Sequence, residues 1–227
     1  HIPPNVSGQL KTDVKMKKTL VKKILIALSI LIGIGIIVYL VMLIWVISAF
    51  GGFDKDYSIT ELKENFEKNK TEILELKQYF NEIVPNNKFV EIEFEDDNTL
   101  FRFGIMTLGS SQGKTKSSNL LEWDLKINTS RMDSIIQPLG WTRETFKTLK
   151  EKLDDADCIQ IESGEPTKIG FKRSGMGMYS FNVFDQPIPD SLRAYYNDSC
   201  TYILANDKLV LEYAGGAVGA QCFYNFK

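Results

Sequence analysis

Histidine is almost absent from this sequence of 227 residues, since the single one is His1. Serine and cysteine hydrolases of the triad type need a histidine beside the nucleophile, and many zinc sites use histidine as a ligand. A lone histidine at the first position supplies neither arrangement to the rest of the chain. We therefore expect no metal site and no cofactor, and the sequence favours a protein that is not an enzyme.

Cysteine is also scarce, with three residues at Cys158, Cys200 and Cys222. None has the close spacing of a metal knuckle or a redox motif. Cys200 and Cys222 flank a predicted hairpin and are the plausible disulfide pair, which leaves Cys158 buried and free. The odd number of cysteines keeps this pairing open.

Charge is missing entirely from Ile24 to Phe53. About 20 apolar helical residues cross a bilayer, so we predict a transmembrane signal anchor over residues 24–50. Lysines crowd its N-terminal side, which places residues 1–23 in the cytoplasm as a basic tail and residues 54–227 in the periplasm or outside the cell. The expected location is thus the inner membrane. A cleavable signal peptide is the alternative, although such signals have shorter apolar cores.

The charge balance differs between the two sides of this segment. Residues 1–23 hold six lysines and one aspartate, which leaves 21 basic and 28 acidic residues in the rest of the chain. An acidic body argues against nucleic acid as a partner. An alternative start at Met16 makes residues 1–15 a segment that is not part of the native protein.

Residues 54–84 are predicted to form one long amphipathic helix. Ser58 and Glu61 have the spacing of a capping box, apolar residues recur at steps of three and four, and Pro85 ends the pattern. One interpretation packs this helix on the following domain. The other makes residues 58–84 a short coiled coil that oligomerises the chain, with Asn69 at a core position fixing the register.

Residues 86–227 are predicted to form an exported α+β domain. Val90, Ile92 and Phe94 alternate with glutamates, and Leu121, Trp123, Leu125 and Ile127 are expected to share one face of a later strand. Further strands follow a helix over 142–155 and a short helix after Pro189, and the last strand is placed at 221–226. The whole chain then reads as α+β: a transmembrane helix, a long amphipathic helix, and a mainly antiparallel sheet with one or two packed helices.

The stretch from Gly109 to Ser118 ends like a phosphate-binding loop, but it is one residue short and precedes a strand rather than a helix. We interpret it as a polar hairpin loop. Paired carboxylates such as Glu162 and Glu165 keep open a carboxylate-dependent hydrolase acting on glycan or peptidoglycan. The row of glutamates beside Val90 is interpreted as a solvated sheet face.

Two further stretches are candidates for contacts. Arg173, Met176, Met178 and Tyr179 have the composition of a partner surface, although a glycine turn with core-facing methionines is the simpler interpretation. Gly215, Gly216 and Gly219 form either a tight connection or a loop that a ligand approaches closely.

The stretches "RSGMGMYSF", "NDSCTYILANDKLVLEY" and "GGAVG" followed by glutamine and aromatic residues resemble small exported proteins of Bacteroidetes, over residues 158–227. The resemblance implies a Gram-negative envelope location and no activity. Our first hypothesis is a single-pass membrane-anchored periplasmic domain that binds a protein, as a subunit of an envelope complex or as an immunity protein against a toxin. The hydrolase and an anchor that oligomerises through residues 58–84 are the alternatives.

Overall fold

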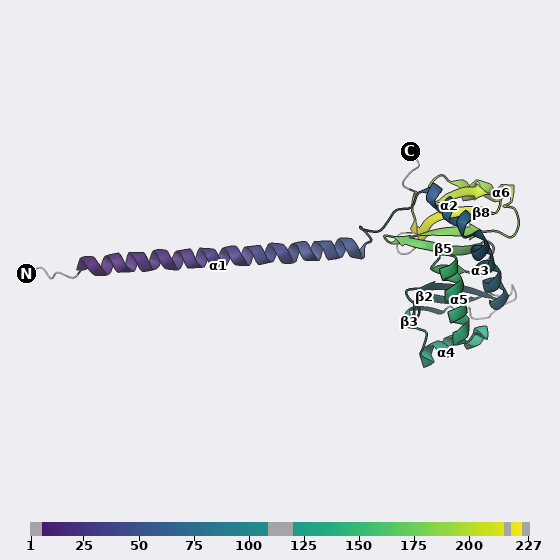
Figure 1. Ribbon diagram of the computed structural model, residues 1–227, viewed down its shortest axis with the longest axis horizontal. Helices are drawn as coiled ribbons and strands as arrows, with labels where there is room; N and C mark the ends of the chain where they lie inside the picture. Colours follow the sequence, from purple (N-terminus) through teal and green to yellow (C-terminus); the bar gives the residue numbers. More distant parts are fainter. Residues whose placement is uncertain (1–5, 109–119, 216–218, 224–227) are drawn as a thin grey trace, which may run out of the picture. The chain divides into compact units, whose positions relative to one another are not determined.

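The computed structural model describes residues 6–108, 120–215 and 219–223 (Figure 1). The chain divides into two units, residues 1–53 and residues 54–227, and we call the second the sheet domain. The Gly109–Ser118 stretch, Gly216 and the last residues of the predicted final strand lie outside the described residues.

Helix α1 (Val6–Ala49) contains the apolar stretch Val21–Ser48, and no residue of this stretch is buried within the chain. At about 1.5 Å per residue, its 28 residues span roughly 42 Å, more than the hydrocarbon core of a bilayer at about 30 Å. The predicted span of 24–50 lies on this helix except for its last residue, Phe50, which follows in a turn. Length and composition fit a membrane anchor or a signal sequence.

The amphipathic region forms two helices, α2 (Ile59–Lys68) and α3 (Lys70–Ile83), so the prediction of one continuous helix is wrong. Ser58 and Glu61 make the predicted capping box at the start of α2. Asn69 separates the helices because its backbone leaves the helical region, with φ −108° and ψ 23°. Asparagine favours such positions because its side chain competes with helical hydrogen bonding.

The strands of the sheet domain form one sheet, and every pairing between them is antiparallel. The order is β3-β2-β1-β4-β5-β6-β8-β7, with β9 paired to β8. The bounds are β1 Lys88–Phe94, β2 Thr99–Thr107, β3 Leu120–Lys126, β4 Gln160–Glu162, β5 Thr167–Ser174, β6 Gly177–Val183, β7 Tyr202–Asn206, β8 Leu209–Gly215 and β9 Gly219–Ala220. The predicted α+β class is confirmed. Within the described residues the last strand is β9, and the strand expected over 221–226 is wrong for residues 221–223, which are not in a strand.

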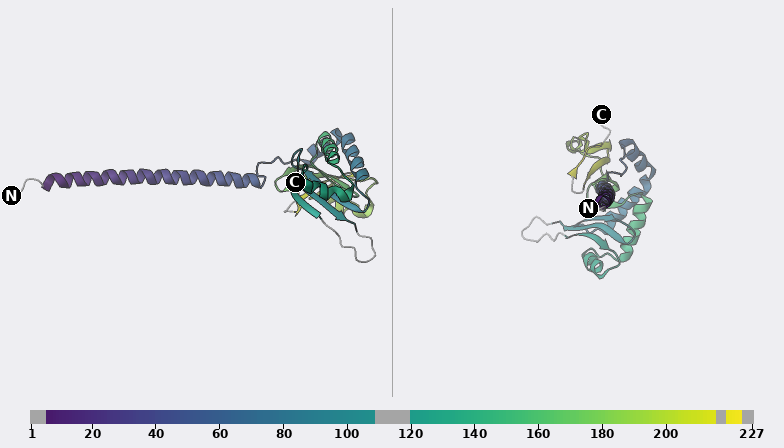
Figure 2. Two further views of the ribbon diagram at one scale, coloured as in Figure 1. Left: turned by 90° about the horizontal axis from the view of Figure 1, so that it is seen from below. Right: turned by 90° about the vertical axis from the view of Figure 1, so that its left-hand side faces the viewer.

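The described part of the domain holds three more α-helices, α4 (Ser130–Ile136), α5 (Arg143–Asp155) and α6 (Asp190–Arg193), and two short 3-10 helices, η1 (Gln137–Leu139) and η2 (Tyr195–Asn197). The helix predicted over 142–155 corresponds to α5, whereas α4 was not predicted. Figure 2 (right) shows the helices of residues 59–83 and 143–155 along one side of the sheet. We call the side of the sheet away from α2, α3 and α5 the open face.

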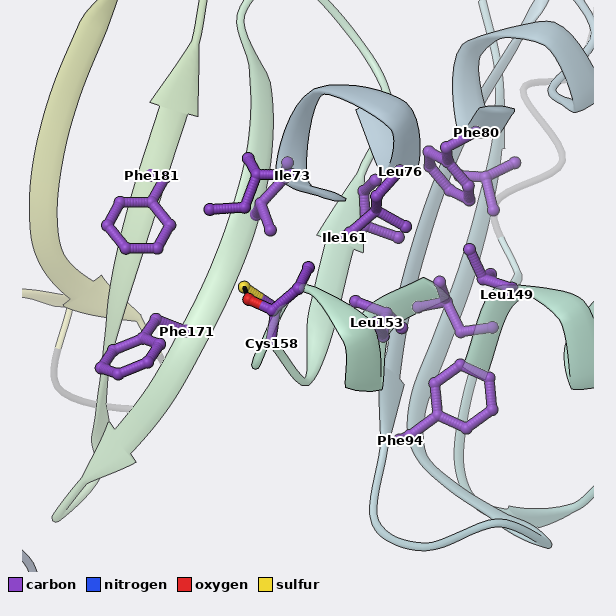
Figure 3. Close-up of a cluster of buried hydrophobic side chains, with 14 of the residues drawn as sticks. Ile73, Leu76, Phe80, Phe94, Leu149, Leu153, Cys158, Ile161, Phe171 and Phe181 are labelled. Atoms are coloured by element: carbon purple, nitrogen blue, oxygen red, sulfur yellow. Dashed lines mark hydrogen bonds between the residues drawn. The ribbon is translucent and has the colours of Figure 1, made fainter. Parts of the chain in front are cut away.

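The main hydrophobic core lies between those helices and the sheet. Figure 3 shows side chains from α3, α5 and the strands meeting there: Ile73, Leu76, Phe80, Leu149, Leu153, Ile161, Phe171 and Phe181. Free Cys158 is buried among them. The apolar faces of α2 and α3, which a coiled coil would use, are thus covered by the protein's own sheet.

Truncating the buried face of α3 tests this packing. Leu76 is 0% exposed, so Leu76→Ala leaves a cavity and is expected to lower the free energy of unfolding by about 2–5 kcal/mol. Leu74 on the same helix is 44% exposed, and Leu74→Ala is expected to cost about 0.5 kcal/mol or less. Urea unfolding of the full chain in detergent measures both. A loss for Leu76→Ala no larger than that for Leu74→Ala would contradict the packing.

Candidate functional site

The predicted partner surface has to be corrected, because two of its four residues are interior. Met178 is 4% exposed and Tyr179 is 0% exposed, and the ring of Tyr179 stacks on Tyr213 at 4.1 Å between centroids. Met176 lies half-buried in the turn between β5 and β6. Arg173 is also half-buried and points across the open face, where it belongs to a different cluster described below.

The glycine loop is a tight connection in its described part. Gly215 and Gly219 have positive φ angles of 112° and 69° and pair with each other between β8 and β9. Cys222 follows at once and forms a disulfide with Cys200. The described residues thus support the structural interpretation of this loop rather than a ligand-approach loop.

Exposed apolar side chains concentrate elsewhere on the sheet domain. Among its described residues, seven large apolar side chains are exposed, and four of them lie on β2, on β3 or directly after β2. These four are Met106, Leu108, Leu121 and Trp123, with Trp123 at 49% and Leu121 at 54% exposure. Single exposed apolar residues are ordinary on a protein surface, but a contiguous group marks an interaction site.

The backbone of β3 brings Leu121 and Trp123 to this surface. Asp124 has a positive φ of 51°, which interrupts the alternation of the strand. Leu125 on the far side of Asp124 is 7% exposed in the core, whereas Trp123 pairs with Arg102 on the open face. The expectation that all four apolar residues of this strand share one face is therefore wrong.

Two sets of contacts on the open face position Trp123, one directly and one through the ring of Phe101. Its ring meets the ring of Phe101 edge to face at 5.4 Å and lies 5.7 Å from the Arg102 guanidinium. Arg102 in turn makes an ion pair with Glu91 on the neighbouring strand β1. We call Phe101, Met106, Leu121 and Trp123 the aromatic edge.

The second set of contacts runs from Phe101 to a buried carboxylate. The Arg173 guanidinium lies 4.5 Å from the centre of the Phe101 ring and donates two hydrogen bonds to Glu93, at 2.6 and 2.7 Å. The Glu93 side chain is only 2% exposed, so its carboxylate is removed from water, whereas the Arg173 side chain is 29% exposed. Both aromatic rings are thus backed by a cation that a glutamate holds in place.

Charged residues continue along the open face beyond this pair. Lys168 donates to Glu212 at 2.8 Å, Asn182 donates to the other oxygen of Glu212, and Gln160 donates to Glu162. Gly170 is required here because a Cβ atom would lie 2.7 Å from Cβ of Gln160. The expectation of a solvated glutamate row on this face is therefore wrong for Glu91 and Glu93, which are shielded and paired with arginines, whereas Glu95 is exposed as expected.

Burial changes the acidity of two carboxyls on this face. Loss of water raises the pKa of Glu91 and of Glu162 above their ordinary value of 4.5, and the attraction of Arg102 and Lys168 opposes this only in part. Glu165, which the sequence paired with Glu162, instead accepts the backbone N–H of Asp185. The neighbouring carboxylates that raise the pKa of Glu162 are those of Glu91 and Glu212.

Compared with protein-family models, with curated proteins and with solved structures, the chain matches none of them. The resemblance to exported Bacteroidetes proteins thus gains no support from these comparisons. Function has to be inferred from the geometry of the sheet domain.

Removing Arg173 tests whether the carboxylate of Glu93 is shielded from water. Arg173→Met leaves a buried carboxylate without its cation and is expected to lower the free energy of unfolding by about 3–5 kcal/mol. The double variant Glu93→Leu, Arg173→Met is expected to recover most of that loss, because no charge then remains buried. Arg143→Met removes an exposed bidentate pair with Asp133 and is expected to have little effect. Equal losses for Arg173→Met and Arg143→Met in urea unfolding would contradict the burial of the Glu93 carboxylate.

The pKa of Glu162 predicts a pH dependence of stability. A pKa raised in the folded chain means that folding favours the protonated carboxyl. The contribution of Glu162 to the free energy of unfolding is therefore full below pH 4.5 and is lost as the pH rises through the folded-state pKa. Glu162→Gln should therefore gain stability relative to wild type as the pH rises above 4.5.

Glu61 is the control of opposite sign, since hydrogen bonds from Lys55 and Ser58 lower its pKa to about 2. The contribution of Glu61 to the free energy of unfolding is present above pH 4.5 and is lost as the pH falls through about 2. Glu61→Gln should therefore lose stability at neutral pH. The free energy of unfolding of wild type and of both variants is measured between pH 3 and pH 8, in steps of roughly one pH unit. These measurements compare the opposite pH dependences expected for Glu162 and Glu61. Parallel curves for Glu162→Gln and wild type would contradict the raised pKa.

Proposed function

We propose that this chain is a single-pass membrane-anchored protein whose sheet domain binds another protein through the aromatic edge. The observation that carries the proposal is Trp123, which is 49% exposed yet fixed by the Phe101 ring and the Arg102 guanidinium. Partly exposed aromatic residues that are already ordered lose little entropy on binding, and tryptophan is enriched among the residues that dominate interface energies.

The position of β3 supports a protein rather than a small molecule as the ligand. Strand β3 is at the end of the strand order, and within the described ranges it pairs only with β2. Its outer backbone edge therefore offers hydrogen-bonding groups directly beside Trp123 and Leu121. An extended segment of a partner adds to such an edge and places its side chains on the exposed apolar residues.

The supporting ion pairs fit a role in recognition better than a role in stability. A buried pair contributes little net stability, because the charges lose their hydration. The Arg173–Glu93 and Arg102–Glu91 pairs do, however, fix the two cations against the rings of Phe101 and Trp123. Such prior ordering lowers the entropic cost of forming an interface.

The location follows from the anchor and the charges. Lysines before the apolar helix favour a cytoplasmic N-terminus, so the sheet domain lies in the periplasm or outside the cell. The acidic balance of residues 24–227 suits a partner with a basic surface. A subunit of an envelope complex and an immunity protein against a toxin both fit this arrangement.

A hydrolase is less well supported by the geometry. Carboxylate-pair hydrolysis needs an acid with raised pKa beside a second acid in a cleft. Glu91 and Glu162 have raised pKa values but sit in the packed network of the open face. Asp185 lines a hollow, but its hydrogen bond from Lys77 lowers its pKa. An anchor that oligomerises through residues 58–84 is likewise disfavoured, since that apolar face is in the core.

Site-specific photocrosslinking in living cells tests the proposed interface. Benzoylphenylalanine at position 121 is expected to capture one partner protein, whereas the same group at the exposed Lys147 on α5 is expected to capture none. Adding Trp123→Ala should weaken capture from position 121 by roughly thirtyfold, the effect of a hot-spot tryptophan worth about 2 kcal/mol.

The identity of the captured protein separates the two roles: a toxin points to an immunity protein, and a resident envelope protein points to a complex subunit. Equal capture from positions 121 and 147, or capture of this chain alone, would sink the proposal. A melting temperature of Trp123→Ala close to that of wild type is the control for folding.

A further inference from the structure

Three polar side chains with complementary reactivity meet on the open face, one from each of three neighbouring strands. Lys168 lies on β5, Asn182 on β6 and Glu212 on β8, and β6 runs between the other two strands. The Lys168 ammonium donates to one oxygen of the Glu212 carboxylate at 2.8 Å, and the Asn182 amide donates to the other oxygen, also at 2.8 Å. One carboxylate therefore holds an amine and a carboxamide side by side.

The strand register brings the amine and the carboxamide together independently of these hydrogen bonds. Lys168 and Asn182 are directly opposite each other in the antiparallel pairing of β5 with β6. Directly opposite side chains in such a pair share a face of the sheet, with Cβ atoms about 4.5–5.5 Å apart. The flexible stem of the lysine can then bring its nitrogen to the carboxamide carbon of Asn182.

Little water reaches this part of the open face. Asn182 and Glu212 are each 5% exposed, and the Lys168 side chain is 21% exposed. Tyr202 lies directly opposite Glu212 on β7, and its ring meets that of Tyr196 edge to face at 5.6 Å. Where water is scarce, a proton passes more readily from an ammonium to a carboxylate, because both groups become neutral.

We propose that Lys168 and Asn182 become joined by an amide bond between their side chains, with Glu212 transferring the protons. The lysine supplies a nucleophilic nitrogen, the carboxamide supplies an electrophilic carbon, and the carboxylate acts first as general base and then as general acid. A buried charge pair contributes little net stability by itself. Stability alone therefore does not account for the three groups, whereas this reaction needs each of them.

The reaction is balanced without any further reactant. Glu212 takes a proton from the Lys168 ammonium, and the freed amine attacks Cγ of Asn182. The bond from Nζ to Cγ forms, and the bond from Cγ to Nδ2 breaks. Glu212 passes its proton, and a second that Nζ loses as the amide forms, to Nδ2, which leaves as an ammonium ion. The carboxylate ends ionised as it began, and no atom is oxidised or reduced.

The amide bond would join β5 to β6 near the end of their hairpin that lies away from the turn at Gly175. Like a disulfide, a covalent link between two strands restricts the unfolded chain, so the linked domain should resist unfolding. None of the three residues belongs to the aromatic edge, and the reaction does not depend on the interface proposed above.

Mass spectrometry of the purified full chain in detergent tests the reaction. After reduction of the disulfide, the intact chain should be lighter than the mass calculated from its sequence by one molecule of ammonia. Trypsin does not cleave after an acylated lysine, so digestion should yield a branched peptide in which residues 153–172 are joined to residues 174–193. Loss of ammonia without this branched peptide would mean that Asn182 or another amide reacts elsewhere, and would overturn the proposal.

Two variants separate the roles of the residues. Lys168→Arg keeps a cation beside Glu212 but removes the nucleophile, and Glu212→Gln keeps the shape of the side chain but removes the proton transfer. Each should have its full calculated mass, with the melting temperature as the control for folding. Lys172→Arg on the same strand is the matched control and should lose ammonia as wild type does, since Lys172 pairs with Asp157.

The wild-type chain decides the proposal even where a variant does not fold. A wild-type chain at its full calculated mass would overturn it, as would a loss of ammonia that persists in Lys168→Arg.

Discussion

The buried carboxylate of Glu93 is the constraint on which the open face depends. A charge with 2% exposure has to be matched by a cation, and Arg173 reaches it from β5 across β4. The same guanidinium then lies against Phe101, which meets Trp123 edge to face. One electrostatic requirement in the middle of the sheet therefore sets the orientation of an aromatic pair near its edge. The Arg102–Glu91 pair repeats this arrangement one strand closer to the edge.

The sequence allows the order of elements to be predicted well, because each depends on a local pattern. Alternation gives the first hairpin, the capping box at Ser58 gives the start of α2, and threonine at position 142 precedes α5. The errors arise where a single backbone position overrides the pattern. Asn69 divides one apolar periodicity into two helices, and Asp124 moves Trp123 to the opposite face from Leu125. Neither residue type dictates such a conformation by itself, so the pattern on both sides of it continues to look regular.

The candidate site was harder to predict than the fold, because it depends on pairings between distant strands. The sequence singles out Arg173, but for a surface in its own turn, since its partners Glu93 and Phe101 are about 70 to 80 residues away in sequence. The glutamates of β1 alternate with apolar residues in the way solvated faces do. Only the register with β2, β4 and the arginine from β5 shows that they are paired and shielded. The pairing of these glutamates could be predicted only from their position opposite Arg102 and near two further cations. That position is visible only once the strand order is known.

Two charged groups of the sheet domain follow the same physical rule. At the aromatic edge, buried carboxylates hold cations that order the rings of Phe101 and Trp123; in the loop after β6, the exposed carboxylate of Asp185 is held by the buried Lys77. In both cases a charge is withdrawn from water, where it contributes little to stability, and its effect is to restrict a group that solvent still reaches. A group ordered before it meets a ligand loses less entropy on binding, so the withdrawn charge affects affinity more than folding. Replacing the charge together with its partner by apolar residues would therefore leave the sheet intact while the exposed group regained its freedom, which is how a role in recognition differs from a role in stability.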